Sequence, residues 1–222
     1  MTILDYILTR RRAAAFAITA ACVFGFKLSA GQQGSLKGAS LEAHEGLTIS
    51  AQPWTDAAQY KEKFPKKSPF SAGILAVNVA FRNDSPESLR INLERIRLTV
   101  QLDAENRQEV QPLSADQLAD AVFKPAAKDP TAKRQRLPIP VPSSSGGRDK
   151  HWSELQKQAL EAAVPSSVVA THGTVQGLLY FDLQNQFDLC QTAHLYIPEI
   201  VEMQQGRALT YFDIDLSRRS TQ

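Results

Sequence analysis

The chain has 222 residues, of which 43% are hydrophobic, so it can bury a sizeable core and is not a wholly disordered protein. Its 25 basic and 23 acidic side chains nearly cancel. This balance excludes the strong positive field that recruits nucleic acid to a protein.

The N-terminus has the pattern of an export signal. Three arginines at residues 10–12 precede an apolar run over residues 13–26, and Ala30 stands just before a small polar stretch. A helix needs about 20 apolar residues to cross the hydrocarbon core of a membrane, so this run is too short for a permanent transmembrane span. We predict a signal peptide over residues 1–30, forming a signal helix, with cleavage after Ala30 and a mature protein outside the cytoplasm.

An alternative for the same segment is a lipid anchor. Thr19-Ala20-Ala21-Cys22 is similar to a degraded lipobox, in which Cys22 would be lipidated, although threonine replaces the usual leucine or valine. Removal of residues 1–30 leaves 21 basic and 22 acidic side chains, a net charge of −1. Cys190 is then the one remaining cysteine, which excludes an intramolecular disulfide, and its apolar neighbours predict a buried thiol.

The first part of the mature chain is predicted to be irregular. Residues 31–46 are small and polar and favour a flexible tether, and residues 47–51 are the first predicted strand. Thr55 is expected to cap a short helix that carries Tyr60 and Phe64. Because this segment is rich in lysine, we expect a connector and not part of the core.

The clearest β pattern follows at residues 73–83, where large apolar side chains alternate with small or polar ones. Apolar residues resume on odd positions over residues 89–93 and then change to even positions from Ile96 to Leu102. A one-residue slip reverses the buried face of a strand. The pattern therefore predicts a break at Glu94-Arg95, where the chain passes from one sheet to another.

Residues 114–163 are predicted to be an insertion between strands. Ser114 and Gln117 have the spacing of a capping box for a helix that ends near Phe123. Residues 124–149 hold five prolines and a Ser/Gly run, which favours a mobile loop. A second amphipathic helix is expected to reach Ala163, with its apolar stripe formed by Trp152, Leu155, Ala159, Leu160 and Ala163.

Short β patterns return at residues 175–183, 195–197 and 212–216, and residues 217–222 are expected to be a disordered tail. Seven or eight short strands separated by turn residues favour a mainly β fold, an antiparallel β-sandwich over residues 47–216.

Three segments carry a family resemblance. They are GILAVNVAFRNDSPESLRINLERIRL at residues 73–98, GLLYFDL at 177–183 and LTYFDIDL at 209–216. They resemble the immunoglobulin-like domains of exported bacterial envelope proteins. The resemblance implies an immunoglobulin-like β-sandwich and a binding or scaffold role, with no catalytic residues to carry over.

Candidate chemistry is sparse. His44, His151, His172 and His194 do not have metal-ligand spacing, although His172 and His194 could meet across adjacent strands. Asp182, Asp213 and Asp215 could serve a Ca²⁺ site or acid/base chemistry, or form a solvated strand face. Nucleophile-elbow, zincin, P-loop and dinucleotide motifs are missing from the sequence. We therefore expect no metal, no cofactor and no enzyme, with a metal-dependent or acid/base hydrolase as the alternative.

The main charge anomaly is the predicted loop. Residues 124–150 contain seven basic and two acidic side chains, a net charge of +5. A basic, proline-rich segment between two helices could bind an acidic partner or an anionic surface, or simply be a solvated linker. Our leading hypothesis is a non-enzymatic binding or scaffold domain whose partner is another envelope protein or the envelope surface. The expected contact residues are Lys133, Arg134, Arg136 and Arg148.

Overall fold

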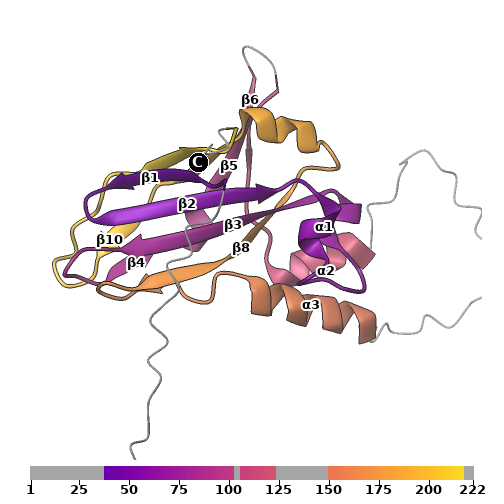
Figure 1. The fold of residues 1–222 in the computed structure, drawn as a ribbon, viewed down its shortest axis with the longest axis horizontal. Coiled ribbons are helices and arrows are strands. Elements are labelled where there is room, and N and C mark those ends of the chain that lie inside the picture. Colours follow the sequence, from indigo (N-terminus) through magenta and orange to yellow (C-terminus); the bar gives the residue numbers. More distant parts are fainter. Residues whose placement is uncertain (1–37, 103–105, 124–149, 218–222) are drawn as a thin grey trace, which may run out of the picture. The chain divides into compact units, whose positions relative to one another are not determined.

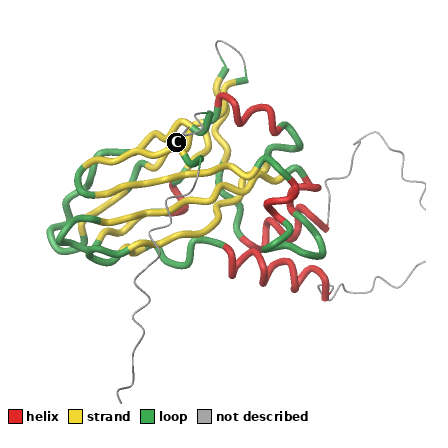
Figure 2. Tube along the Cα trace, in the orientation of Figure 1, coloured by secondary structure: helices red, strands yellow, loops and turns green. Residues whose placement is uncertain are grey.

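The computed structural model describes residues 38–102, 106–123 and 150–217, all of which belong to the compact unit formed by residues 33–222. This unit is mainly β, with three antiparallel sheets and few helices (Figures 1 and 2). The α-helices are α1 (Ala57–Tyr60), α2 (Ala115–Phe123) and α3 (Lys150–Ala162). The strands are β1 (Ser40–His44), β2 (Leu47–Trp54), β3 (Ile74–Asn83), β4 (Leu89–Ile91), β5 (Arg97–Gln101), β6 (Arg107–Val110), β7 (Val168–Val169), β8 (Thr174–Asp182), β9 (His194–Ile197), β10 (Ile200–Glu202) and β11 (Phe212–Asp215).

The strand order shows which strands lie side by side in each sheet. The first sheet has the order β1-β2-β3-β8, the second β10-β4-β7 and the third β11-β9-β5-β6. Buried side chains from all three sheets form one hydrophobic cluster, in which Phe81 and Phe181 of the first sheet share the core with Phe212 of the third. This is the layered arrangement of a β-sandwich.

The predicted break at Glu94-Arg95 is confirmed. A 3₁₀ helix over Leu93–Arg95 separates β4 in the second sheet from β5 in the third. Ile91 before the break and Ile96 after it are both buried, although they stand on positions of opposite parity. The helical turn absorbs the one-residue slip, so both strands keep their apolar face toward the same core.

A second hydrophobic cluster lies on the other side of the first sheet, where the helices gather at one end (Figure 1). Tyr60 and Phe64 are fully or almost fully buried in it, together with Tyr180 of β8 and Trp152 of α3. The Tyr60 hydroxyl donates to the Ile74 carbonyl at 3.0 Å. The expectation that this segment is only a connector is therefore wrong.

Several other boundaries differ from the sequence predictions. Residues 40–44, expected in the flexible tether 31–46, form strand β1, which pairs along β2 from Ser40 opposite Ala51. The cap of α1 is Asp56 and not Thr55, and its carboxylate accepts the Ala58 N–H at 2.9 Å. Leu160 of α3, placed on the apolar stripe, is 66% exposed.

Other predictions hold or lie outside the described residues. The capping box of α2 is confirmed, since Ser114 and Gln117 exchange hydrogen bonds at 2.8 and 3.2 Å. The signal segment 1–30, the loop 124–149 and residues 218–222 of the predicted tail lie outside the described part of the chain.

Side chains join the edges of the first and third sheets. Glu42 of β1 accepts the backbone N–H of Asp213 in β11 at 2.7 Å, and Glu45 in the β1-β2 turn accepts the N–H of Thr210 at 2.6 Å. The hydrogen bond from the Thr210 N–H holds the pKa of Glu45 below its usual value. The carboxylates therefore satisfy backbone donors that a neighbouring strand would otherwise pair.

The same edge is strengthened by an aromatic stack and a charge cluster. The His44 ring stacks on Phe212 with ring centroids 3.7 Å apart. Arg207 forms two hydrogen bonds with the largely buried Glu202, which lower the pKa of Glu202, and lies 3.6 Å from Glu45. The edge between β1 and β11 is thus held by side chains from both sheets.

Candidate functional site

Helices α2 and α3 bring the two ends of residues 124–149 together. The Trp152 indole N–H donates to Asp120 at 2.8 Å, and the Gln156 side-chain amide donates to Asp116 at 2.7 Å. Because one partner of each pair is on α2 and the other on α3, these bonds run between the two helices in antiparallel order. The two helices therefore fix the positions of the described residues on either side of the basic segment, Phe123 and Lys150.

A lysine-rich stretch lies beside these ends. Residues 61–67 contain four lysines and one glutamate, a net charge of +3, and all four lysines are exposed. Lys66 Nζ lies 2.7 and 3.0 Å from the two carboxylate oxygens of Glu154 in α3, which lowers the pKa of Glu154. Lys67 Nζ lies 4.7 Å from the centroid of the Phe123 ring at the end of α2. The connection after α1 thus adds its charge to the end of the helical pair.

We call this surface the basic end and define it by Lys61, Lys63, Lys66, Lys67, Phe123, Lys150 and His151. It contains a groove of about 320 Å³, lined by Lys66, Lys67, Phe123, His151, Glu154, Leu155 and Gln158. Phe123 and the almost fully buried Leu155 are the apolar residues of this lining, and Lys66 and Lys67 are its cations. A site of this kind can hold an anionic group next to an apolar one.

The basic end adds its positive charge to that of the predicted contact segment, residues 124–150. Residues 124–150 carry +5 and residues 61–67 carry +3, so the remainder of the mature chain carries −9. Lys133, Arg134, Arg136 and Arg148 lie outside the described residues, as do Ala30 and Cys22. The contribution of residues 61–67 could not be predicted from the sequence, because the 56 residues 68–123 separate them from the basic segment along the chain.

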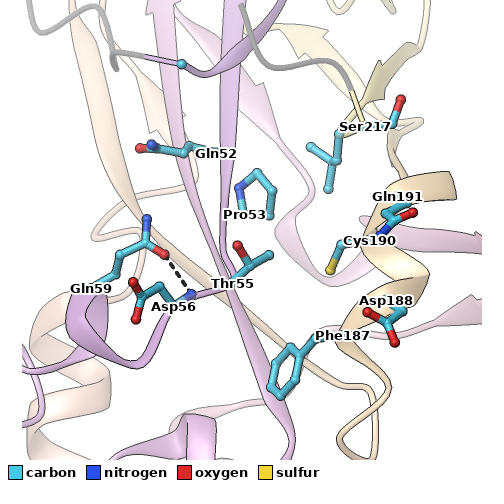
Figure 3. A pocket seen from close by; sticks show the side chains of 12 residues that line it. Gln52, Pro53, Thr55, Asp56, Gln59, Phe187, Asp188, Cys190, Gln191 and Ser217 are labelled. Atoms are coloured by element: carbon cyan, nitrogen blue, oxygen red, sulfur yellow. Dashed lines mark hydrogen bonds between the residues drawn. The ribbon is translucent and has the colours of Figure 1, made fainter.

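A second concave site lies between the end of β2 and the 3₁₀ helix over Phe187–Thr192 (Figure 3). Pairing of β1 with β2 stops at Ala51, and Pro53 has no N–H with which to extend the ladder. The resulting cleft has a volume of about 640 Å³. Asp56 and Gln59 at its border are joined by the hydrogen bond drawn in Figure 3, so both act in the helix cap.

Cys190 lines this cleft, and its sulfur is directed toward it in Figure 3. The residue is 6% exposed, and burial, helped by the nearby Asp188, raises the pKa of the thiol to about 11. A thiol with this pKa stays protonated at neutral pH and is a poor nucleophile. The prediction of a buried Cys190 thiol is confirmed.

The outer face of the third sheet brings some of the predicted acidic residues together. Asp213 and Asp215 of β11 stand opposite Tyr196 and His194 of β9. His194 Nδ1 lies 3.2 Å from Asp213 Oδ1, a charge contact without hydrogen-bond geometry. Asp182 is on β8 in the first sheet, away from this face. Of the three aspartates in the hydrolase alternative, the structure therefore brings only Asp213 and Asp215 together.

His172 and His194, which could have met across adjacent strands, do not lie on adjacent strands. His172 stands in a turn with a φ of 52°, just before β8, whereas His194 is on β9, and the two strands belong to different sheets. Within residues 38–102, 106–123 and 150–217, no three His, Cys, Asp or Glu side chains converge as metal ligands would. In the same part of the chain, no helix is long and apolar enough to span a membrane.

Comparison with known proteins identifies no family. No family model matches the chain, and no curated protein matches it. Among solved structures, the chain is similar to the crystal structure of a functionally unknown protein from Listeria monocytogenes EGD-e, with 14% sequence identity and a TM-score of 0.34. The match covers 73% of this chain and 71% of that protein.

Proposed function

We propose that the chain is an exported, non-enzymatic binding domain that attaches to an anionic surface of the cell envelope through its basic end and the adjoining residues 124–149. The observation that carries this proposal is the gathering of +3 from residues 61–67 beside the ends of a segment with +5. The rest of the mature chain carries −9, so attraction to a negative surface would orient the domain with this end inward.

The type of basic residue favours binding to an extended anionic surface over binding of a single carboxylate or phosphate group. The cations of the basic end are lysines, which are mobile point charges, whereas bidentate recognition of one group generally uses arginine. A lysine close to an anionic membrane contributes about 1 kcal/mol of attraction at moderate salt. The partly buried Phe123 in the groove adds apolar surface that could enter the interface.

The proposed topology is immunoglobulin-like. In such domains one sheet contains strands A, B and E in that order, and the facing sheet contains G, F, C and C′. The orders β2-β3-β8 and β11-β9-β5-β6 support this assignment, with β1 as an extra strand beside β2. In this assignment β6 corresponds to C′ and β8 to E. Helices α2 and α3 then lie between these two strands along the chain.

The binding proposal is tested with the mature chain, residues 31–222, and a variant that lacks residues 124–148. We expect the deletion to reduce binding to purified envelope membranes at least tenfold, and Lys66→Ala combined with Lys67→Ala to reduce it further. The control combines Arg82→Ala with Arg95→Ala, which removes the same charge from exposed side chains in β3 and beside β5. Unchanged binding by the deletion variant would reject the proposed contact element.

Export is tested separately by mass spectrometry of the native N-terminus. Processing by a signal peptidase predicts a mature chain that begins at Gly31, directly after Ala30. A chain that begins with a lipidated Cys22 would instead establish the lipoprotein alternative. An unprocessed chain found in the cytoplasm would reject export.

A further inference from the structure

The outer face of the third sheet carries a second surface, distinct from the basic end. Leu98, Leu195 and Ile214 point into the main core, and the alternate residues of the same strands line an open groove of about 860 Å³ on the other face. The groove is lined by polar and tyrosine side chains from β5, β6, β9 and β11 and their flanking residues.

Two tyrosines form an aromatic platform in this groove. The rings of Tyr196 and Tyr211 have centroids 5.4 Å apart and are tilted by 52°. Tyr211 is 54% exposed, which is unusual for so large a side chain and leaves ring surface open to a ligand. Aromatic faces are electron-rich and attract weakly polarised C–H groups as well as cations.

Hydrogen-bonding groups beside the platform are held in place by their neighbours. Asp213 contacts His194, and Asp215 accepts hydrogen bonds from both the N–H and the hydroxyl of Ser217. Asp213 and Asp215 stand two residues apart on β11, so their carboxylate oxygens are acceptors on the same side of the sheet. Such fixed acceptors reduce the entropy lost when a ligand with many hydroxyl groups binds.

The composition of the groove selects the ligand class. Its lining has no aliphatic side chain, whereas the centre of a protein–protein interface is typically apolar. Glu109, Asp213 and Asp215 outnumber Arg107, so the lining has a formal charge of −2, which disfavours anionic polymers. A hydroxyl-rich, uncharged ligand fits both the carboxylate acceptors and the tyrosine platform.

We propose that the outer face of β11-β9-β5-β6 binds an uncharged oligosaccharide, with a sugar ring stacked on Tyr211 and its hydroxyl groups donating to Asp213 and Asp215. The inference does not depend on the proposed attachment through the basic end. Neutral saccharides are plentiful in the cell envelope, so an exported domain would meet such a ligand there.

The test uses calorimetric titration of the mature chain with four tetrasaccharides. Two are neutral, the tetramers of N-acetylglucosamine and of β-1,4-linked glucose; one is cationic, the glucosamine tetramer; one is anionic, the galacturonate tetramer. We expect at least one neutral tetramer to bind saturably, and Tyr211→Ala to weaken that binding at least tenfold. Asp213→Asn should weaken it as well, while Met203→Ala, which removes another exposed apolar side chain, should not.

Two outcomes would overturn the proposal. One is the lack of saturable binding by both neutral tetramers up to about 10 mM, a concentration that would detect even weak affinity. The other is binding of the cationic tetramer alone, abolished by salt, which would mark the face as a cation site. Because Tyr211 is exposed, its alanine variant is expected to keep the wild-type unfolding temperature, which separates lost binding from lost folding.

Discussion

Strand β3 and residues 178–181 of β8 are buried on both faces, but the two faces are stabilised differently. On the inner face, side chains such as Val77 and Phe181 belong to the main core between the sheets. On the outer face, Ile74 and Tyr180 belong to the cluster beneath the helices. There the Tyr60 hydroxyl accepts from the N–H of Ala76 and shares its single proton between the carbonyls of Ile74 and Trp54, at 3.0 and 3.1 Å. The inner core depends on apolar packing, whereas the outer core also depends on hydrogen bonds between side chains and backbone.

This difference shows how the helical insertion belongs to the fold. Tyr180 donates to the Ala159 carbonyl of α3, and the Leu113 N–H donates to the Tyr180 carbonyl. Helices α2 and α3 are therefore held to the edge of the first sheet on both sides of residues 124–149. The basic end is attached to a rigid support, which suits a contact surface.

The largest effect is expected in the main core. Phe181→Ala removes a fully buried ring and should lower the free energy of unfolding by about 3–5 kcal/mol. Urea denaturation measures this change, with Leu160→Ala as the exposed control, expected within about 0.5 kcal/mol of wild type. A loss below about 1 kcal/mol would mean that the ring is not packed as described.

The junction between β8 and the end of α3 should be nearly as sensitive. A Cβ atom at Gly177 would lie 2.5 Å from the carbonyl carbon and oxygen of Ala163 and from the nitrogen of Val164. Because backbone atoms cannot move aside like a flexible side chain, Gly177→Ala should cost about 2–3 kcal/mol. Gln176→Ala, at the exposed neighbouring position, is the control. Equal stabilities of the two variants would contradict this close approach.

A smaller loss is expected from the hydrogen bonds of the outer core. Tyr60→Phe leaves the buried Ala76 N–H without its side-chain acceptor and should cost about 1–3 kcal/mol. Tyr180→Phe is the matched control, since the Ala159 carbonyl keeps its bond from the Ala163 N–H, and it should cost less than about 1 kcal/mol. If both variants lose the same amount, the outer core does not depend on Tyr60 as a hydrogen-bonding centre.

The smallest effect concerns the sheet edge at Glu45. Its pKa in the folded state lies below the ordinary glutamate value of 4.5, mainly because of the hydrogen bond from Thr210. Its contribution to stability is therefore present above pH 4.5 and is lost as the pH falls through the folded pKa. At pH 7 the wild-type protein should have a higher unfolding temperature than the Glu45→Gln variant. In acid the two unfolding temperatures should be equal. Glu94→Gln, at an exposed position, should show no such pH dependence. A difference that persists in acid would assign the effect to packing.

The sequence predicted the strands in which large apolar side chains alternate with smaller or polar ones. Alternation over residues 73–83 and 175–183 located β3 and β8, and the parity change after Leu93 located the break between β4 and β5. These predictions succeeded because burial of alternate side chains is a local property of the sequence.

Other features depend on contacts between distant segments and could not be predicted. Strand β1 has a short polar sequence, and the carboxylates of Glu42 in β1 and Glu45 just after it accept hydrogen bonds from backbone groups 171 and 165 residues away. Tyr60 appeared to belong to a lysine-rich connector, because its partner carbonyl at Ile74 and the covering helices come later in the chain. The sequence identified residues 124–150 as a basic segment, whereas the contribution of residues 61–67 required the contacts of Lys66 and Lys67.

The attachment of the domain to an anionic surface is tested most directly by vesicle binding of the mature chain at two salt concentrations. Vesicles with about one third anionic lipid should bind the protein at low salt, and about 0.5 M salt, which shortens the Debye length to a few ångströms, should reduce that binding at least tenfold. Neutral vesicles should bind little protein at either salt concentration. Equal binding to neutral and anionic vesicles, or no binding to either, would contradict the proposed function.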